Sequence, residues 1–74
     1  MRTNSRQSDG STVVASHSIG LGSHVILSVS STGYQTYIRD DMGLRMHCRH
    51  WPLDCLRGAV ADYHEQIQAS RLFA

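Results

Sequence analysis

The sequence predicts an α+β fold: a three- to four-stranded antiparallel β-meander with one C-terminal α-helix packed on one face. Two alternating apolar and polar runs flank a glycine-ended turn between residues 34 and 50, and a third alternating run lies at 24–30. After residue 52, apolar residues recur every three or four positions, which is typical of a helix. A chain of 74 residues forms one small domain whose core alone is marginal.

The N-terminal segment, residues 1–10, contains almost no apolar side chains, and we expect a flexible tail there. The single folded domain then spans residues 11–74. Residues 13–15, Val-Val-Ala among Ser and Thr, predict a short edge strand. The sequence Gly-Leu-Gly at 20–22 predicts a connection.

The run 24–30 predicts a strand, because β-branched and aliphatic residues alternate with polar ones. Its inward side chains are Val25, Leu27 and Val29. A turn follows at Ser31-Thr32-Gly33, and a two-residue loop at Thr32-Gly33 sets Leu27 opposite Ile38 and Val29 opposite Thr36. This pairing keeps the apolar faces of the two strands together.

The second hairpin has a three-residue loop, Asp41-Met42-Gly43, in which Gly43 occupies the position that favours a left-handed backbone. This loop places Ile38 opposite Met46 and Arg39 opposite Arg45. One face of the hairpin then carries Tyr34, Thr36, Ile38, Leu44, Met46 and Cys48. The other face carries Gln35, Tyr37, Arg39, Arg45, His47 and Arg49.

The helix is expected to begin at Pro52, which suits a first helical position because it has no N–H to leave unpaired. Its apolar stripe contains Leu53, Leu56, Val60, Tyr63 and Ile67, and polar residues such as Arg57, Asp62 and Glu65 lie mostly away from it. Gly58 costs about 1 kcal/mol relative to Ala inside a helix, which indicates that a neighbouring surface approaches closely there.

The predicted core forms where the helix stripe meets the inner face of the meander. Its sheet residues are Val25, Leu27, Val29, Ile38, Leu44, Met46 and Cys48, and Trp51 closes one end. An antiparallel sheet can leave its other face in water. We therefore expect the face with the arginines to be uncovered.

That uncovered face is the predicted binding surface. All seven basic residues of the chain are arginines, although the net charge is only +1. Arginine offers a planar fork of donors that matches carboxylate or phosphate, and Arg39 facing Arg45 is unfavourable unless an anion bridges the pair. We expect a non-enzymatic interaction protein that docks onto an acidic or phosphate-bearing surface of a larger protein or nucleoprotein complex, with nucleic acid as another possible partner. A solvated polar face, with arginine favoured by a GC-rich genome, is the alternative.

Catalytic and metal chemistry have weaker support in the sequence. Cys48 and His50 could form a nucleophile–base pair, but no third group orients them, and we expect neither an enzyme nor a cofactor. A small zinc-stabilised domain is an alternative that would use Cys48, His50, Cys55 and His64. Their spacing differs from that of structural zinc sites, where ligand pairs lie two to four residues apart.

Three resemblances suggest functions. The tripeptide Gly22-Ser23-His24 entering a strand, followed by more strands and a final helix, resembles the HicA-type RNA-cleaving toxins, although the first helix of that family is missing here. This resemblance implies RNA binding or cleavage with His24 as the catalytic residue. The order of elements is also similar to the double-stranded-RNA-binding fold without its first helix. In size and economy the chain resembles small phage- or plasmid-encoded inhibitors of host machinery, anti-CRISPR proteins included.

The sequence also predicts a location and an assembly state. Its N-terminus lacks the apolar segment of a secretory signal, and no apolar run approaches the roughly 20 residues needed to span a bilayer. We expect a cytoplasmic protein with two reduced cysteines and no membrane partner. Leu72 and Phe73 extend the apolar surface after the helix and could seal a homodimer.

Overall fold

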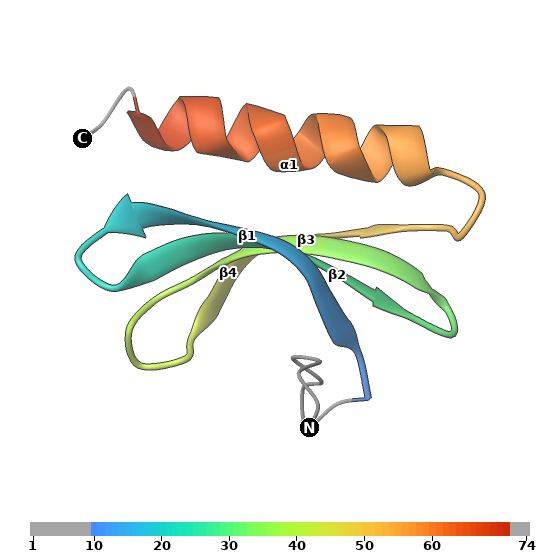
Figure 1. Ribbon diagram of the computed structural model, residues 1–74, viewed down its shortest axis with the longest axis horizontal. Helices are drawn as coiled ribbons and strands as arrows, with labels where there is room; N and C mark the ends of the chain where they lie inside the picture. The colour runs from blue at the N-terminus through green and yellow to red at the C-terminus, as the bar shows by residue number, and fades with distance from the viewer. Residues whose placement is uncertain (1–9, 72–74) are drawn as a thin grey trace.

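Residues 10–71 form a four-stranded antiparallel sheet with one helix lying across one face (Figure 1), as described by a computed structural model. The elements are β1 (Thr12–Gly20), β2 (Ser23–Ser30), β3 (Gly33–Arg39), β4 (Arg45–Trp51) and α1 (Leu56–Arg71). The strands lie side by side in chain order. The predicted α+β fold class is confirmed, and the first strand is longer than expected. The expectations for the tail up to residue 9, and for Leu72 and Phe73, fall outside the described residues.

Strands β1 and β2 are joined by a two-residue turn, Leu21-Gly22, between the paired residues Gly20 and Ser23. Both turn residues have positive φ angles, 56° and 80°, as a type I′ turn requires. A Cβ on Gly22 would lie only 2.7 Å from the Cβ of Asp41 in the β3–β4 loop. The absence of a side chain at Gly22 therefore lets the two loops touch.

The β2–β3 connection uses Ser31-Thr32 as its loop, since Ser30 pairs with Gly33. The predicted loop was one residue too late, so the predicted pairing was wrong: Leu27 faces Thr36 and Val29 faces Tyr34. The register differs by two residues, which keeps every side chain on its predicted face because side-chain direction alternates with a period of two. The predicted separation of faces is therefore preserved in these two strands.

The β3–β4 hairpin has the predicted loop. The N–H of Asp40 donates to the carbonyl of Leu44 at 3.0 Å, and Gly43 has a φ of 87°. Ile38 pairs with Met46 and Arg39 with Arg45, as expected. Beyond this point the pairing shifts, because Thr36 faces Arg49 rather than Cys48.

The shift is a β-bulge in which His47 and Cys48 together oppose Tyr37. His47 has a φ of 56°, a left-handed conformation that is uncommon outside glycine. An extra residue in one strand exchanges the two faces for everything that follows. Arg49 and Trp51 therefore turn toward the helix side of the sheet, and His50 turns away from it.

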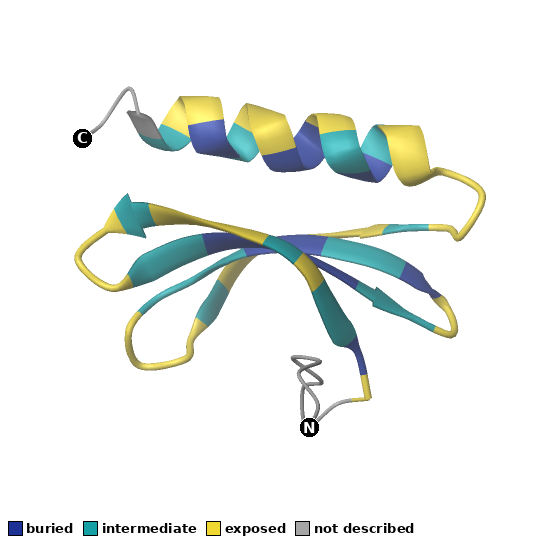
Figure 2. Ribbon diagram, viewed as in Figure 1, coloured by how far each residue is buried: buried dark blue, intermediate teal, exposed yellow. Residues whose placement is uncertain are grey.

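The core lies between α1 and the centre of the sheet, where dark segments of both layers face each other in Figure 2. Its buried residues are Val25, Leu27, Ala59, Tyr63 and Ile67, flanked by Ala15, Ile19, Tyr34, Ile38, Trp51 and Val60. The predicted core positions Leu44, Met46 and Cys48 are wrong, since all three are exposed. Leu44 belongs to the loop, Met46 keeps its predicted pairing with Ile38 but lies exposed on edge strand β4, and Cys48 is part of the bulge.

The helix begins at Leu56, about one turn later than predicted. Cys55 N–H donates to the carbonyl of Pro52 at 2.9 Å, and the carbonyl of Cys55 accepts the first helical hydrogen bond from Ala59. Pro52 therefore opens a turn, and the predicted stripe residues Leu53 and Leu56 are exposed. The expectation for Gly58 is confirmed, because a Cβ there would lie 2.8 Å from Cζ3 of Trp51.

Candidate binding surface

The face of the sheet turned away from α1 is here called the outer face (Figure 1). Ile26 and Tyr37 are cross-strand partners on this face, and both are almost completely buried. Tyr37 was predicted to be part of the contact surface. Its ring has no exposed area, so it supports neighbouring side chains rather than stacking on a ligand.

Three cationic or imidazole side chains lie side by side near one end of the outer face. His24 on β2 pairs with Arg39 on β3, and Arg39 pairs with Arg45 on β4. We call these three residues the cationic row. Each of the three residues is half-buried.

Arg45 is held in place from below. Its guanidinium carbon lies 4.5 Å from the centroid of the Tyr37 ring, and its Nη1 donates to Oε1 of Gln35 at 3.3 Å. A cation over a buried aromatic face is attracted by the ring quadrupole. The predicted residues Gln35, Tyr37 and Arg45 thus form one connected unit, in which the first two position the third.

The acidic residues next to the row are engaged in the β3–β4 loop. Oδ1 of Asp40 accepts hydrogen bonds from the backbone N–H groups of Met42 at 2.9 Å and Leu44 at 2.8 Å. Asp41 lies at the loop contact with Gly22. Within residues 10–71, no carboxylate forms an ion pair with Arg39.

His47 and Arg49, the other two predicted surface residues, do not share this face. The bulge places them at a cleft of about 430 Å³ between β4 and α1. The cleft is lined by Ile38, His47, Arg49, Asp62, Glu65, Gln66, Ala69 and Ser70. The prediction of one continuous six-residue surface was therefore wrong for these two positions.

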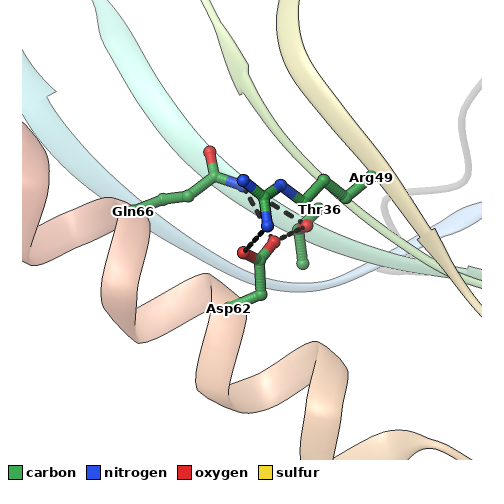
Figure 3. Close-up of polar contacts among 4 residues, drawn as sticks. All are labelled: Thr36, Arg49, Asp62 and Gln66. Carbon is green, nitrogen blue, oxygen red and sulfur yellow. Dashed lines mark hydrogen bonds and ion pairs between the residues drawn. The ribbon is translucent and has the colours of Figure 1, made fainter.

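A polar network forms the floor of this cleft (Figure 3). Asp62, only 4% exposed, accepts a hydrogen bond from the Thr36 hydroxyl and another from Nε2 of Gln66 at 3.0 Å. Nη1 of Arg49 lies 3.5 Å from Oδ1 of Asp62, although the Arg49 side chain is 63% exposed. The network ties α1 to β3 and β4, which gives Asp62 a structural role.

Sequence reasoning missed Asp62, which it placed on the solvent side of the helix. Asp62 follows Ala59 by three positions and precedes Gln66 by four, so it lies on the helix face that packs over β3. A buried Thr36 in the facing strand supplies the polar partner that a buried carboxylate needs. A polar Thr36 on the predicted inner face of the sheet was the sequence signal that a polar helix residue faces it.

A second, smaller pocket of about 150 Å³ opens on the outer face beside Gln35. We call it the hydroxyl pocket. It is lined by Ser11, Ser28, Ser30, Thr32, Gly33, Gln35 and His50. His50 reaches it because the bulge turns this side chain away from α1, and no carboxylate is among the lining residues.

Comparison of the chain with family models, curated proteins and solved structures finds no match. Within residues 10–71, the helix α1 has only 16 residues and is too polar to span a membrane.

The predicted alternative of a zinc site does not form in the described part of the chain. Over residues 10–71, no three His, Cys, Asp or Glu side chains lie close enough to hold a metal ion. Cys48 and Cys55 are free, exposed thiols. Cys48 lies on edge strand β4 and Cys55 precedes α1, so neither contributes to a cluster with His50 and His64.

Proposed function

We propose that this protein is a small non-enzymatic binding module whose outer face binds anionic groups on a larger protein or nucleoprotein complex. The observation that carries the proposal is the cationic row of His24, Arg39 and Arg45 on three neighbouring strands. The proposal keeps the outer face as the binding surface and leaves His47 and Arg49 out of it.

The row favours an anionic ligand because like charges face each other directly. Arg39 and Arg45 are cross-strand partners, and such a pair is destabilising in an otherwise neutral sheet. The neighbouring Asp40 carboxylate is engaged with loop N–H groups through its Oδ1. A carboxylate or phosphate beside Arg39 would accept charge-assisted hydrogen bonds from its guanidinium, which forms no ion pair within residues 10–71.

Positioning of Arg45 also supports binding. The Tyr37 ring and the Gln35 amide restrict the guanidinium, so less side-chain freedom is lost when a ligand arrives.

The experiment that tests this function measures binding of two fluorescein-labelled probes, a single-stranded RNA 12-mer and a poly-glutamate peptide. Fluorescence anisotropy is recorded between 20 and 300 mM NaCl for the wild type, Arg39→Glu and Arg57→Glu. Arg57 is an exposed arginine on α1, on the other side of the sheet, so it provides a matched control for the change in net charge.

We expect at least one probe to bind the wild type at low salt, with an affinity that falls as salt rises. Arg39→Glu should weaken that binding at least tenfold, and Arg57→Glu should change it less than twofold. Equal losses in the two variants would show unspecific attraction and overturn the proposal. Cleavage of the RNA probe that His24→Ala abolishes would replace it by the nuclease activity that the HicA resemblance implies.

A further inference from the structure

The hydroxyl pocket on the outer face contains a buried hydroxyl that has no partner. Ser28 is 1% exposed, and its Oγ forms no hydrogen bond. Its neighbour Leu27 packs in the core, so Ser28 projects to the opposite, outer face where the pocket lies. Burying a hydroxyl without a hydrogen bond is unfavourable. A ligand that forms a hydrogen bond with Oγ of Ser28 would remove this cost.

Two of the other hydroxyls are engaged, because Oγ of Ser30 and Oγ1 of Thr32 share a hydrogen bond of 3.0 Å. Oε1 of Gln35 already accepts from Arg45, which leaves the amide N–H₂ of Gln35 to face other partners. The His50 ring lies against Gly33, where a Cβ would come within 3.1 Å of Cε1 and 3.2 Å of Nε2 of the imidazole. Gly33 thus allows the imidazole to lie close to the strand at the edge of the pocket.

The charge and size of the pocket restrict the ligand. Its lining contains an imidazole, an amide and four hydroxyls but no carboxylate, which favours an anion over a metal cation. A volume of about 150 Å³ is well below the roughly 300 Å³ at which pockets for drug-sized ligands begin. It accommodates a single tetrahedral group rather than a nucleoside or a peptide side chain with its backbone.

We propose that the hydroxyl pocket binds a phosphate group, with Ser28, Gln35 and His50 as hydrogen-bond donors. This inference rests on the proposed function, because the pocket opens on the same face and Gln35 connects it to Arg45 of the cationic row. It deepens that function by choosing phosphate over carboxylate as the anion. The phosphate is either a free ion or a monoester on a larger molecule.

The test uses ¹H–¹⁵N NMR titrations of the full-length protein with inorganic phosphate and with phenyl phosphate. NaCl at matched ionic strength serves as the blank. The variants are Ser28→Ala and His50→Asn, with Ser31→Ala as the control, because Ser31 is an exposed turn residue that does not line the pocket. Melting temperatures of all variants are measured without ligand.

We expect saturable shifts of the amide resonances of Ser28, Gly33 and Gln35, and at least tenfold weaker binding in Ser28→Ala and His50→Asn. Ser31→Ala should bind as the wild type does. Without ligand, the melting temperature of Ser28→Ala should be unchanged or higher, because the variant removes an unpartnered buried hydroxyl. Tighter binding of phenyl phosphate identifies a monoester, and tighter binding of inorganic phosphate identifies the free ion.

Absence of saturable shifts, or equal phosphate affinity in Ser28→Ala and the wild type, would contradict phosphate binding in the hydroxyl pocket. A fall in the melting temperature of ligand-free Ser28→Ala would also overturn it, since it would give the hydroxyl a structural role. The proposed function would survive these results if Arg39→Glu still weakened binding of the RNA or poly-glutamate probe. If Arg39→Glu left binding of both probes unchanged while phosphate still bound the hydroxyl pocket, the proposed macromolecular function would be wrong and the proposed phosphate site would remain supported.

Discussion

Thr36 in the middle of β3 donates a hydrogen bond to the carboxylate of Asp62 on α1, and both residues are almost completely buried. Asp62→Ala should destabilise the protein by about 2–3 kcal/mol, because it removes the acceptor of the buried Thr36 hydroxyl and one of the two acceptors of Gln66 Nε2. Urea unfolding followed by circular dichroism measures this change.

The double variant Thr36→Val with Asp62→Leu is the matched control for that prediction. It removes both polar partners and fills the space with apolar groups, so it should be markedly less destabilised than Asp62→Ala. Equal destabilisation of the single and double variants would contradict the role assigned to this pair. It would show that the loss of unfolding free energy comes from disturbed packing.

Gly58 and Trp51 make a second contact that can be tested. Gly58→Ala would gain about 1 kcal/mol from helix propensity alone. Its Cβ, however, would lie 2.8 and 2.9 Å from two ring carbons of Trp51, so the ring must move. We expect a net loss of about 1–2 kcal/mol in unfolding experiments.

The control for Gly58→Ala is the same substitution in a Trp51→Leu background. With the large ring gone, the alanine should stabilise that background toward the full propensity gain of about 1 kcal/mol. If Gly58→Ala destabilised both backgrounds equally, contact with Trp51 would not be the reason for glycine at this position.

Most of the sheet could be predicted because its information is local. The sequence Asp41-Met42-Gly43 specifies one hairpin loop, and the alternation in β2 and β3 separates the two faces even when the loop is misplaced by one residue. An error of two residues in register leaves the face of each side chain unchanged, whereas an error of one reverses it.

The bulge at His47 could not be predicted for that reason. It inserts a single residue, and nothing in the segment Met46-His47-Cys48 resembles the glycine that usually occupies a left-handed bulge position. Arg49 therefore lies beside Asp62 and not on the predicted surface, and His50 lies on the outer face. The faces of the β4 residues after the bulge therefore depend on the left-handed backbone of His47.

Leu21 has an unusual conformation for its residue type, with a φ of 56° and 98% of its area exposed. Asn-Gly is a preferred sequence for a type I′ turn, since Asn tolerates a left-handed backbone better than Leu does. Leu21→Asn should therefore stabilise the protein by about 1 kcal/mol in urea unfolding.

Met42→Asn separates the backbone effect from the removal of an exposed apolar side chain. Met42 is 87% exposed, but it is not among the residues with positive φ. We expect a change of less than about 0.5 kcal/mol for this surface substitution. A gain at Met42 as large as the gain at Leu21 would show that backbone strain at Leu21 is not responsible.

Tyr63 links stability to pH. Burial in the core raises the pKa of its phenol above the usual value of 10.0, since the charged form loses hydration there. The unfolded chain ionises first as the pH rises, so the contribution of Tyr63 to stability is complete below about pH 10 and is lost as the pH passes through the raised folded-state pKa. We expect Tyr63→Phe, normalised to its own stability at pH 8, to lose less stability than the wild type between pH 9 and 11. Urea midpoints across this range measure the difference, and parallel curves for the two proteins would contradict the raised pKa.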